Sequence, residues 1–189
     1  NKRQGCESVS FHITTYEPNF DTMVVGDSVH EVVLFCLDGD SRQVVDGVLA
    51  VEVRDPEWLD PVFMPELAAV LRECGATWCL CLHAKMPRLA DQLPLLRLLW
   101  PGPMVCRWNL NPLHGAYGYE DAQREYSPYD RIHDVDDETR ALLVKTIAGI
   151  AGAGQNVYVT ISNKAEGCAP LSVRALAEGL ARKPGAISP

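Results

Sequence analysis

Short apolar runs alternate with amphipathic segments from Val48 to the C-terminal end of the sequence. Four of these runs have strand length and are bounded by polar or turn-forming residues: 48–53, 77–82, 104–109 and 156–161. Strands that are buried on both sides of a parallel sheet are continuously apolar rather than alternating. The pattern therefore predicts four parallel strands.

Helix signals fill the segments between and after these runs. The first predicted helix begins at Asp60 and ends at Gly75, the second contains Leu93, Leu96 and Leu99, and the third lies near 120–126. The fourth runs from Asp136 or Asp137 to about Ala151, and the last opens at Pro170. Strands that alternate with helices indicate an α/β fold.

The first 47 residues do not continue this alternation. The apolar positions of 9–13 alternate with polar ones, as in a half-buried strand, and 31–37 is a second strand-like run. Residues 17–28 have the composition of a loop. We therefore predict two N-terminal strands in 1–47.

The length limits the architecture that these elements can form. We predict one domain over 1–189, with atypical strands in 1–47 and βα units in 48–183. A complete (β/α)8 barrel has about 250 residues, which exceeds the 189 residues here. About four βα units and two N-terminal strands predict an incomplete or atypical TIM-type barrel, whose open side is covered by the N-terminal strands or by a second copy of the chain.

The amino-acid composition and the net charge limit the kinds of molecule that this protein is expected to bind. The sequence is 47% hydrophobic and 22% charged, as in globular proteins, and no apolar run reaches the roughly 18 residues that a membrane helix needs. A net charge of −8 disfavours nucleic acid. Seven cysteines, an odd number with no signal peptide before them, lead us to expect a cytoplasmic protein with free thiols.

Polar side chains stand at the end of every predicted strand from Val48 onward. They are Glu52 and Arg54, His83 and Lys85, Arg107 and Asn109, and Asn163 with Glu166 in the loop that follows. Ligands of parallel βα arrays bind at the carboxyl ends of the strands, so this pattern predicts a ligand-binding cleft. The alternative is a structural ion-pair network in which Arg107 neutralises Glu52.

At these strand ends the chain resembles the YecE-like family, a family of domains of unknown function with a TIM-type barrel. The matching segments are Ala50-Val-Glu-Val-Arg-Asp-Pro-Glu-Trp58, Arg107-Trp-Asn-Leu110, Tyr117-Gly-Tyr119, Val157-Tyr-Val-Thr-Ile-Ser-Asn163 and Glu166-Gly-Cys-Ala-Pro170. The similarity extends over about residues 48–180.

The resemblance implies a polar cleft formed by Glu52, Arg54, Trp58, Arg107, Tyr119 and Asn163. The chain departs from the family pattern in two places. Ser162-Asn163 stands where the family often has two carboxamide or acidic residues, and the family's glycine-rich opening half is not visible in 1–47.

A metal site is weakly indicated. Cys79, Cys81 and His83 share one face of a predicted strand, but alternate residues of a strand lie about 6.5–7 Å apart, too far for easy chelation of one ion. We prefer a buried face of thiols, with a cluster of His83, His114 and Glu52 as the alternative, and predict no metal ligands.

The residues favour an anion-binding function. Arg54 and Arg107 can grip a phosphate or carboxylate, with Glu52 and Glu166 as candidate catalytic carboxylates. Asn109, Tyr119 and Asn163 complete the predicted ligand-binding set. We therefore expect a small anionic or phosphorylated ligand with hydrolase-like chemistry; no cofactor follows from the sequence. The alternatives are a metal-dependent, endonuclease-like nucleic-acid enzyme, to which the resemblance points, and a non-catalytic interaction domain that forms homo-oligomers or packs on another partner.

Overall fold

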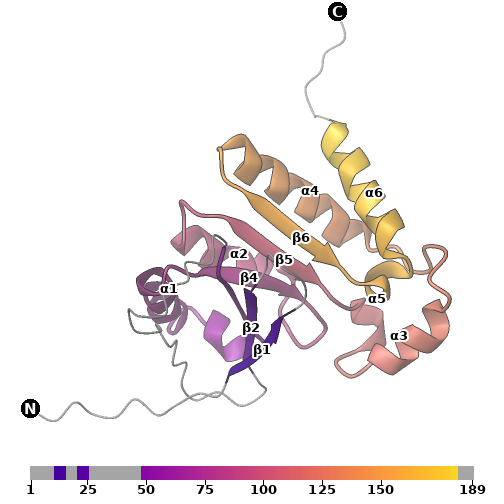
Figure 1. Cartoon of the computed structure of the whole chain (residues 1–189), viewed down its shortest axis with the longest axis horizontal. Helices are drawn as coiled ribbons and strands as arrows, with labels where there is room; N and C mark the ends of the chain where they lie inside the picture. The colour runs from indigo at the N-terminus through magenta and orange to yellow at the C-terminus, as the bar shows by residue number, and fades with distance from the viewer. Residues whose placement is uncertain (1–10, 16–20, 26–47, 183–189) are drawn as a thin grey trace, which may run out of the picture.

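The strands of the computed structural model form one sheet in chain order (Figure 1). The structure describes residues 11–15, 21–25 and 48–182. The strands are β1 (Phe11–Thr15), β2 (Asp21–Val25), β3 (Ala50–Val53), β4 (Thr77–Leu82), β5 (Met104–Trp108) and β6 (Val157–Ile161). β1 is antiparallel to β2, and every other neighbouring pair is parallel. The predicted α/β class is confirmed.

Six helices belong to the described part of the chain. They are α1 (Met64–Glu73), α2 (Leu89–Leu98), α3 (Tyr119–Tyr126), α4 (Asp137–Gly152), α5 (Asn163–Glu166) and α6 (Ala169–Ala181). Two short 3-10 helices, Pro56–Leu59 and Pro112–His114, follow β3 and β5. Figure 1 shows α4 running beside β6, and α4 and α6 both contact that strand and each other.

The two faces of the sheet have different surroundings. Val51, Val53, Leu80 and Trp108 belong to the main core, where the sheet packs on buried side chains of the helices such as Leu67. Alternate residues of a strand point to opposite faces of the sheet. The apolar residues can therefore lie on the face that packs on the helices, while the polar ones lie on the other face.

On the other face, Ala50, Cys79 and Val105 form a smaller buried cluster. This second face carries the polar strand ends.

Three predicted local features differ in the structure. Residues 21–25, within the segment expected to be a loop, form β2, which pairs with strands on both sides. Asp60 does not cap α1; its Oδ1 accepts from Val62 N, and the helix begins at Met64 after a turn. The one-turn helix α5 was not predicted at all. The strand expected at 31–37 lies outside the described residues.

A tight turn at Gly167 ends α5 and fixes the segment that leads into α4. Gly167 has φ +111°, and a Cβ there would lie 2.7 Å from the carbonyl oxygen of Arg131 and 2.8 Å from the ring of His133. The backbone N–H of His133 also donates to the carbonyl of Glu166 at 2.7 Å. The absence of a side chain at 167 therefore lets these two backbone segments approach.

We predict that Gly167→Ala destabilises the protein more than Gly154→Ala. Both glycines have positive φ, but a Cβ at Gly154 has no atom within 4 Å. Gly154→Ala should cost only the left-handed strain of about 1–2 kcal/mol, and Gly167→Ala should cost more because backbone must also move. Urea unfolding followed by circular dichroism measures both, and equal losses would show that the close approach at Gly167 is absent.

Candidate functional site

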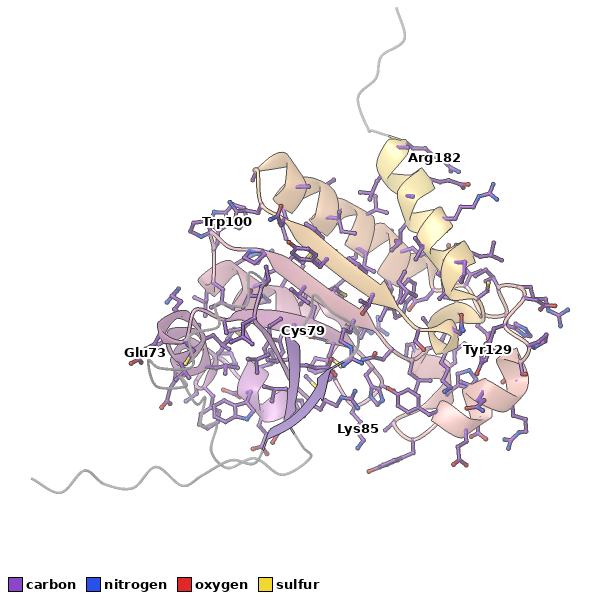
Figure 2. The ribbon with its side chains drawn as sticks, in the orientation of Figure 1. Glu73, Cys79, Lys85, Trp100, Tyr129 and Arg182 are labelled. Carbon is purple, nitrogen blue, oxygen red and sulfur yellow. The ribbon has the colours of Figure 1, made fainter. Side chains whose placement is uncertain are left out.

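The register of the parallel strands brings charged residues of β3 and β5 together on one face. Cys81 of β4 lies opposite Arg107 of β5, and Glu52 of β3 lies one strand further along the sheet. Because the strands are parallel and successive in the sheet, their carboxyl ends meet at one edge. Figure 2 shows Cys79, from the same face, near the centre of the molecule.

Glu52 is the centre of this group of side chains. Its side chain is completely buried, and each carboxylate oxygen accepts a hydrogen bond from a different arginine. Arg54 Nε donates to Oε1 at 2.8 Å, and Arg107 Nη1 donates to Oε2 at 2.7 Å. A buried carboxylate needs such charged partners, since an unpaired charge in the interior is very costly.

Two thiols complete the surroundings of the carboxylate. Cys81 Sγ lies 3.3 Å from Glu52 Oε1, and Cys79 Sγ lies 4.0 Å from Oε2. Burial, together with the negative charge of Glu52, raises the pKa of Cys81 to about 12 and raises that of Cys79 well above its usual range. Both side chains are therefore protonated, weak hydrogen-bond donors at neutral pH.

The arginines remain accessible to solvent although their shared partner is not. The side chain of Arg54 is 24% exposed and that of Arg107 is 31% exposed. Burial alone would lower the pKa of Arg54, but the hydrogen bond and charge of Glu52 outweigh it and raise the pKa above its ordinary value. Two guanidinium groups and one carboxylate leave this cluster with one net positive charge.

Asn109 and Tyr119 also belong to the neighbourhood of this cluster. Asn109 Nδ2 donates to Cys81 Sγ at 3.6 Å. Burial raises the pKa of Tyr119, and the charges of Arg54 and Arg107 act on the same hydroxyl in the opposite direction. The structure thus brings Glu52, both arginines, Asn109 and Tyr119 to one region.

Two further side chains surround the Tyr119 ring. The His83 ring lies 5.2 Å from it, and Lys164 Nζ lies 5.6 Å from its centroid. Lys164 was not among the predicted site residues, because α5, which carries it, was not predicted either.

Glu166 belongs to a separate buried cluster. Its Oε1 accepts from the backbone N–H of Asp136 at 2.8 Å, and its Oε2 accepts from Arg140 Nη2 at 2.7 Å and from Ser172 Oγ at 2.6 Å. The carboxylate is completely buried, and it ties the start of α4 to α5 and α6. The structure does not bring it to Glu52, and its contacts are those of a structural residue.

Asn163 and Trp58 also have local contacts of their own. Asn163 Oδ1 accepts from the backbone N–H of Ala169 at 2.8 Å, at the beginning of α6. Trp58 packs edge-on against Phe63, with ring centroids 6.4 Å apart, and is partly buried against the main core. Within residues 48–182 neither side chain forms a hydrogen bond with the Glu52 cluster.

Three further observations concern the cysteines, metal binding and membrane-spanning helices. The five cysteines in the described ranges are free thiols. No group of three or more His, Cys, Asp or Glu side chains among the described residues is arranged to hold a metal ion. None of the helices in that part of the chain has both the length and the apolar character to cross a bilayer.

Comparison with known proteins gives one family. A family described as "Protein of unknown function DUF72" matches residues 29–189. A crystal structure of a DUF72 family protein from Enterococcus faecalis V583 is similar at 17% sequence identity with a TM-score of 0.49, over 76% of this chain and 51% of that one. The chain thus spans about half the length of that protein. A search of curated proteins found no match.

We predict that Glu52→Gln lowers the free energy of unfolding by about 3–5 kcal/mol. An amide cannot neutralise the two guanidinium groups, and breaking a buried ion pair costs about that much. Glu138→Gln is the matched control, because Glu138 pairs with Arg88 where both side chains are more than 70% exposed, and such pairs contribute less than about 1 kcal/mol. Urea unfolding measures both; similar losses would contradict the central position of Glu52.

We also predict that the native state loses stability as the pH rises from the usual thiol range near 8.5 toward 12. The raised pKa of Cys81 favours the protonated thiol in the folded protein, so its contribution is complete below the unfolded pKa and is lost as the pH passes through the folded value. Cys81→Ala should reduce this alkaline loss. Thermal unfolding across this pH range tests the difference, and identical pH profiles for wild type and Cys81→Ala would refute it.

Proposed function

The chain belongs to DUF72, a family of unknown function, and we propose that its strand-end cluster binds a small anionic ligand through Arg54 and Arg107. The observation that carries this proposal is the buried Glu52 carboxylate that the two partly exposed guanidinium groups share. Two arginines share this one carboxylate, so the positive charges outnumber the negative one. Here a second positive charge is held nearby, and one charge is left over for a ligand.

The hydrogen-bond inventory supports the same ligand class. Each guanidinium has five N–H donors, and each uses one of them on Glu52. Among the described residues neither arginine makes a further hydrogen bond, so the remaining donors can serve a ligand. Planar guanidinium groups match the oxygens of phosphate and carboxylate in paired hydrogen bonds. A phosphorylated small molecule fits best, because a phosphate offers oxygens to both arginines at once.

The hydrolase-like part of the proposal concerns Glu52. It is the carboxylate that contacts both arginines, and an anion that takes over part of their hydrogen bonding would free a carboxylate oxygen to accept a proton. Glu166 has no such position, since its oxygens are satisfied by Arg140, Ser172 and backbone. We therefore assign the acid–base role to Glu52 alone.

We further propose that this sheet is part of a TIM-type barrel. Successive parallel strands support this, and so does the location of the helices against one face and of the polar cluster on the other. In such barrels the ligand site lies at the carboxyl ends of the strands. Within the described ranges the outer edges of β1 and β6 pair with no further strand, so barrel closure would need chain or a partner beyond them.

We predict that Arg107→Ala weakens the binding of inorganic phosphate about tenfold or more. A hydrogen bond between charged groups contributes about 1.5–3 kcal/mol, and 1.4 kcal/mol corresponds to a factor of ten. Arg107→Lys keeps the charge but loses the paired geometry, so its affinity should lie between those of wild type and Arg107→Ala. Isothermal titration calorimetry with phosphate measures all three.

Arg97→Ala is the matched control for this experiment. Arg97 is an exposed arginine in the last turn of α2, outside the cluster, so its removal should leave phosphate affinity unchanged. Circular dichroism should first establish that each variant is folded. Equal affinity for wild type and Arg107→Ala would overturn the proposal, as would tighter binding of a single-stranded oligonucleotide than of phosphate that is independent of both arginines.

A further inference from the structure

A cavity of about 650 Å³ has His83, whose ring contacts Tyr119, among its lining residues. It is enclosed by the N-terminal ends of α2 and α4 and by the segments that follow β4 and β5. Neither Glu52, Arg54 nor Arg107 lines it. Its volume is in the range of small-molecule sites, which is about 300–1,000 Å³.

The inner wall of this cavity is apolar and well packed. Leu82, Leu89, Trp108 and Leu110 line it and are all buried. The rim is also partly apolar, since Leu113 is 75% exposed and Val135 is 51% exposed. Apolar side chains that remain in water beside a cavity are typical of ligand-binding surfaces, because a bound apolar group would cover them.

The mouth of the cavity is acidic. Asp136, Asp137 and Glu138 contribute to its lining at the start of α4, and Arg88 contributes from the start of α2. Arg88 Nη1 donates to both carboxylate oxygens of Glu138, at 3.0 and 3.1 Å, so these two charges neutralise each other.

Two other carboxylates of this rim, Asp136 and Asp137, have a different environment. Asp136 Oδ1 accepts from the backbone N–H of Thr139 and caps α4. Neither Asp136 nor Asp137 forms an ion pair among the described residues. The rim therefore presents net negative charge next to an apolar interior.

We propose that this cavity binds a small apolar molecule that carries a protonated amine. The apolar part would be buried against Leu113 and Val135, the lining side chains that are still exposed, and the ammonium group would lie at the rim beside Asp137. Burial of apolar surface supplies the affinity, at roughly 25 cal/mol per Å², and the rim charge selects the sign of the polar group. The rim of this cavity differs from the anion site, whose net charge has the opposite sign.

Three probes of similar size test the ligand class at neutral pH: 2-phenylethylamine, 2-phenylethanol and phenylacetate. Amide chemical shifts in ¹H–¹⁵N spectra of the full chain report where and how tightly each one binds. The amine should perturb the backbone of residues 135–139 and bind most tightly, and phenylacetate should bind most weakly there. Equal affinities for the three probes at this cavity, or no perturbation of its lining, would overturn the proposal.

One pair of variants distinguishes binding in the cavity from binding at the surface around it. Ala90 is an exposed residue of α2 that lines the cavity, so Ala90→Trp should occlude it and abolish binding of the amine. Ala141→Trp, at an exposed position of α4 outside the lining, should bind as wild type does. Retention of binding by Ala90→Trp would show that the cavity is not the site.

The charge of the rim is tested by Asp137→Asn. It should weaken binding of the amine about two- to fivefold, the range expected for a partly exposed charge pair, and leave 2-phenylethanol unaffected. Glu66→Gln, an exposed acidic residue in the first turn of α1, is the matched control and should change neither affinity. An equal effect of the two substitutions would contradict a specific role of the rim. Phosphate titration of the same variants should be unchanged, so failure here is distinguishable from failure of the anion site.

Discussion

The polar side of the sheet depends on one buried carboxylate shared by two arginines. Glu52 has no exposed surface, so its charge is tolerated only because Arg54 and Arg107 donate to its two oxygens. The negative charge of Glu52 also allows Arg54 and Arg107 to lie close together, although their two positive charges repel each other. The thiols of Cys79 and Cys81 fill the remaining space around it. This arrangement explains how the arginines pair with a buried carboxylate and still reach solvent.

Glu166 provides an instructive contrast. It is also a completely buried carboxylate paired with an arginine, but its other hydrogen bonds come from a backbone N–H and from Ser172. These partners belong to α4 and α6, so the carboxylate joins helices and leaves no excess positive charge. A buried carboxylate therefore has different roles at these two positions. Glu52 has two arginines and leaves one positive charge for a ligand, whereas Glu166 has one arginine and only joins helices. This is why the anion-binding proposal rests on the Glu52 cluster.

The apolar runs predicted the four strands from Ala50 onward well, because each strand is mostly apolar and β3, β4 and β5 are largely buried. Features that depend on long-range partners were not predictable. β2 at Asp21–Val25 is a strand because it pairs on both sides, which its local composition does not reveal. α5 is a single turn, too short for a helical period.

The sequence also identified only some of the residues of the candidate site correctly. Glu52, Arg54 and Arg107 followed from the rule that strand ends meet at one edge, and the structure brings them into contact. The rule also selected Glu166, but its pairing with Arg140, 26 positions away, has no sequence signal. A crystal structure determined in the presence of inorganic phosphate tests the central claim most directly. The account predicts a phosphate within hydrogen-bonding distance of both Arg54 and Arg107. Guanidinium groups that contact only Glu52 at saturating phosphate would contradict it.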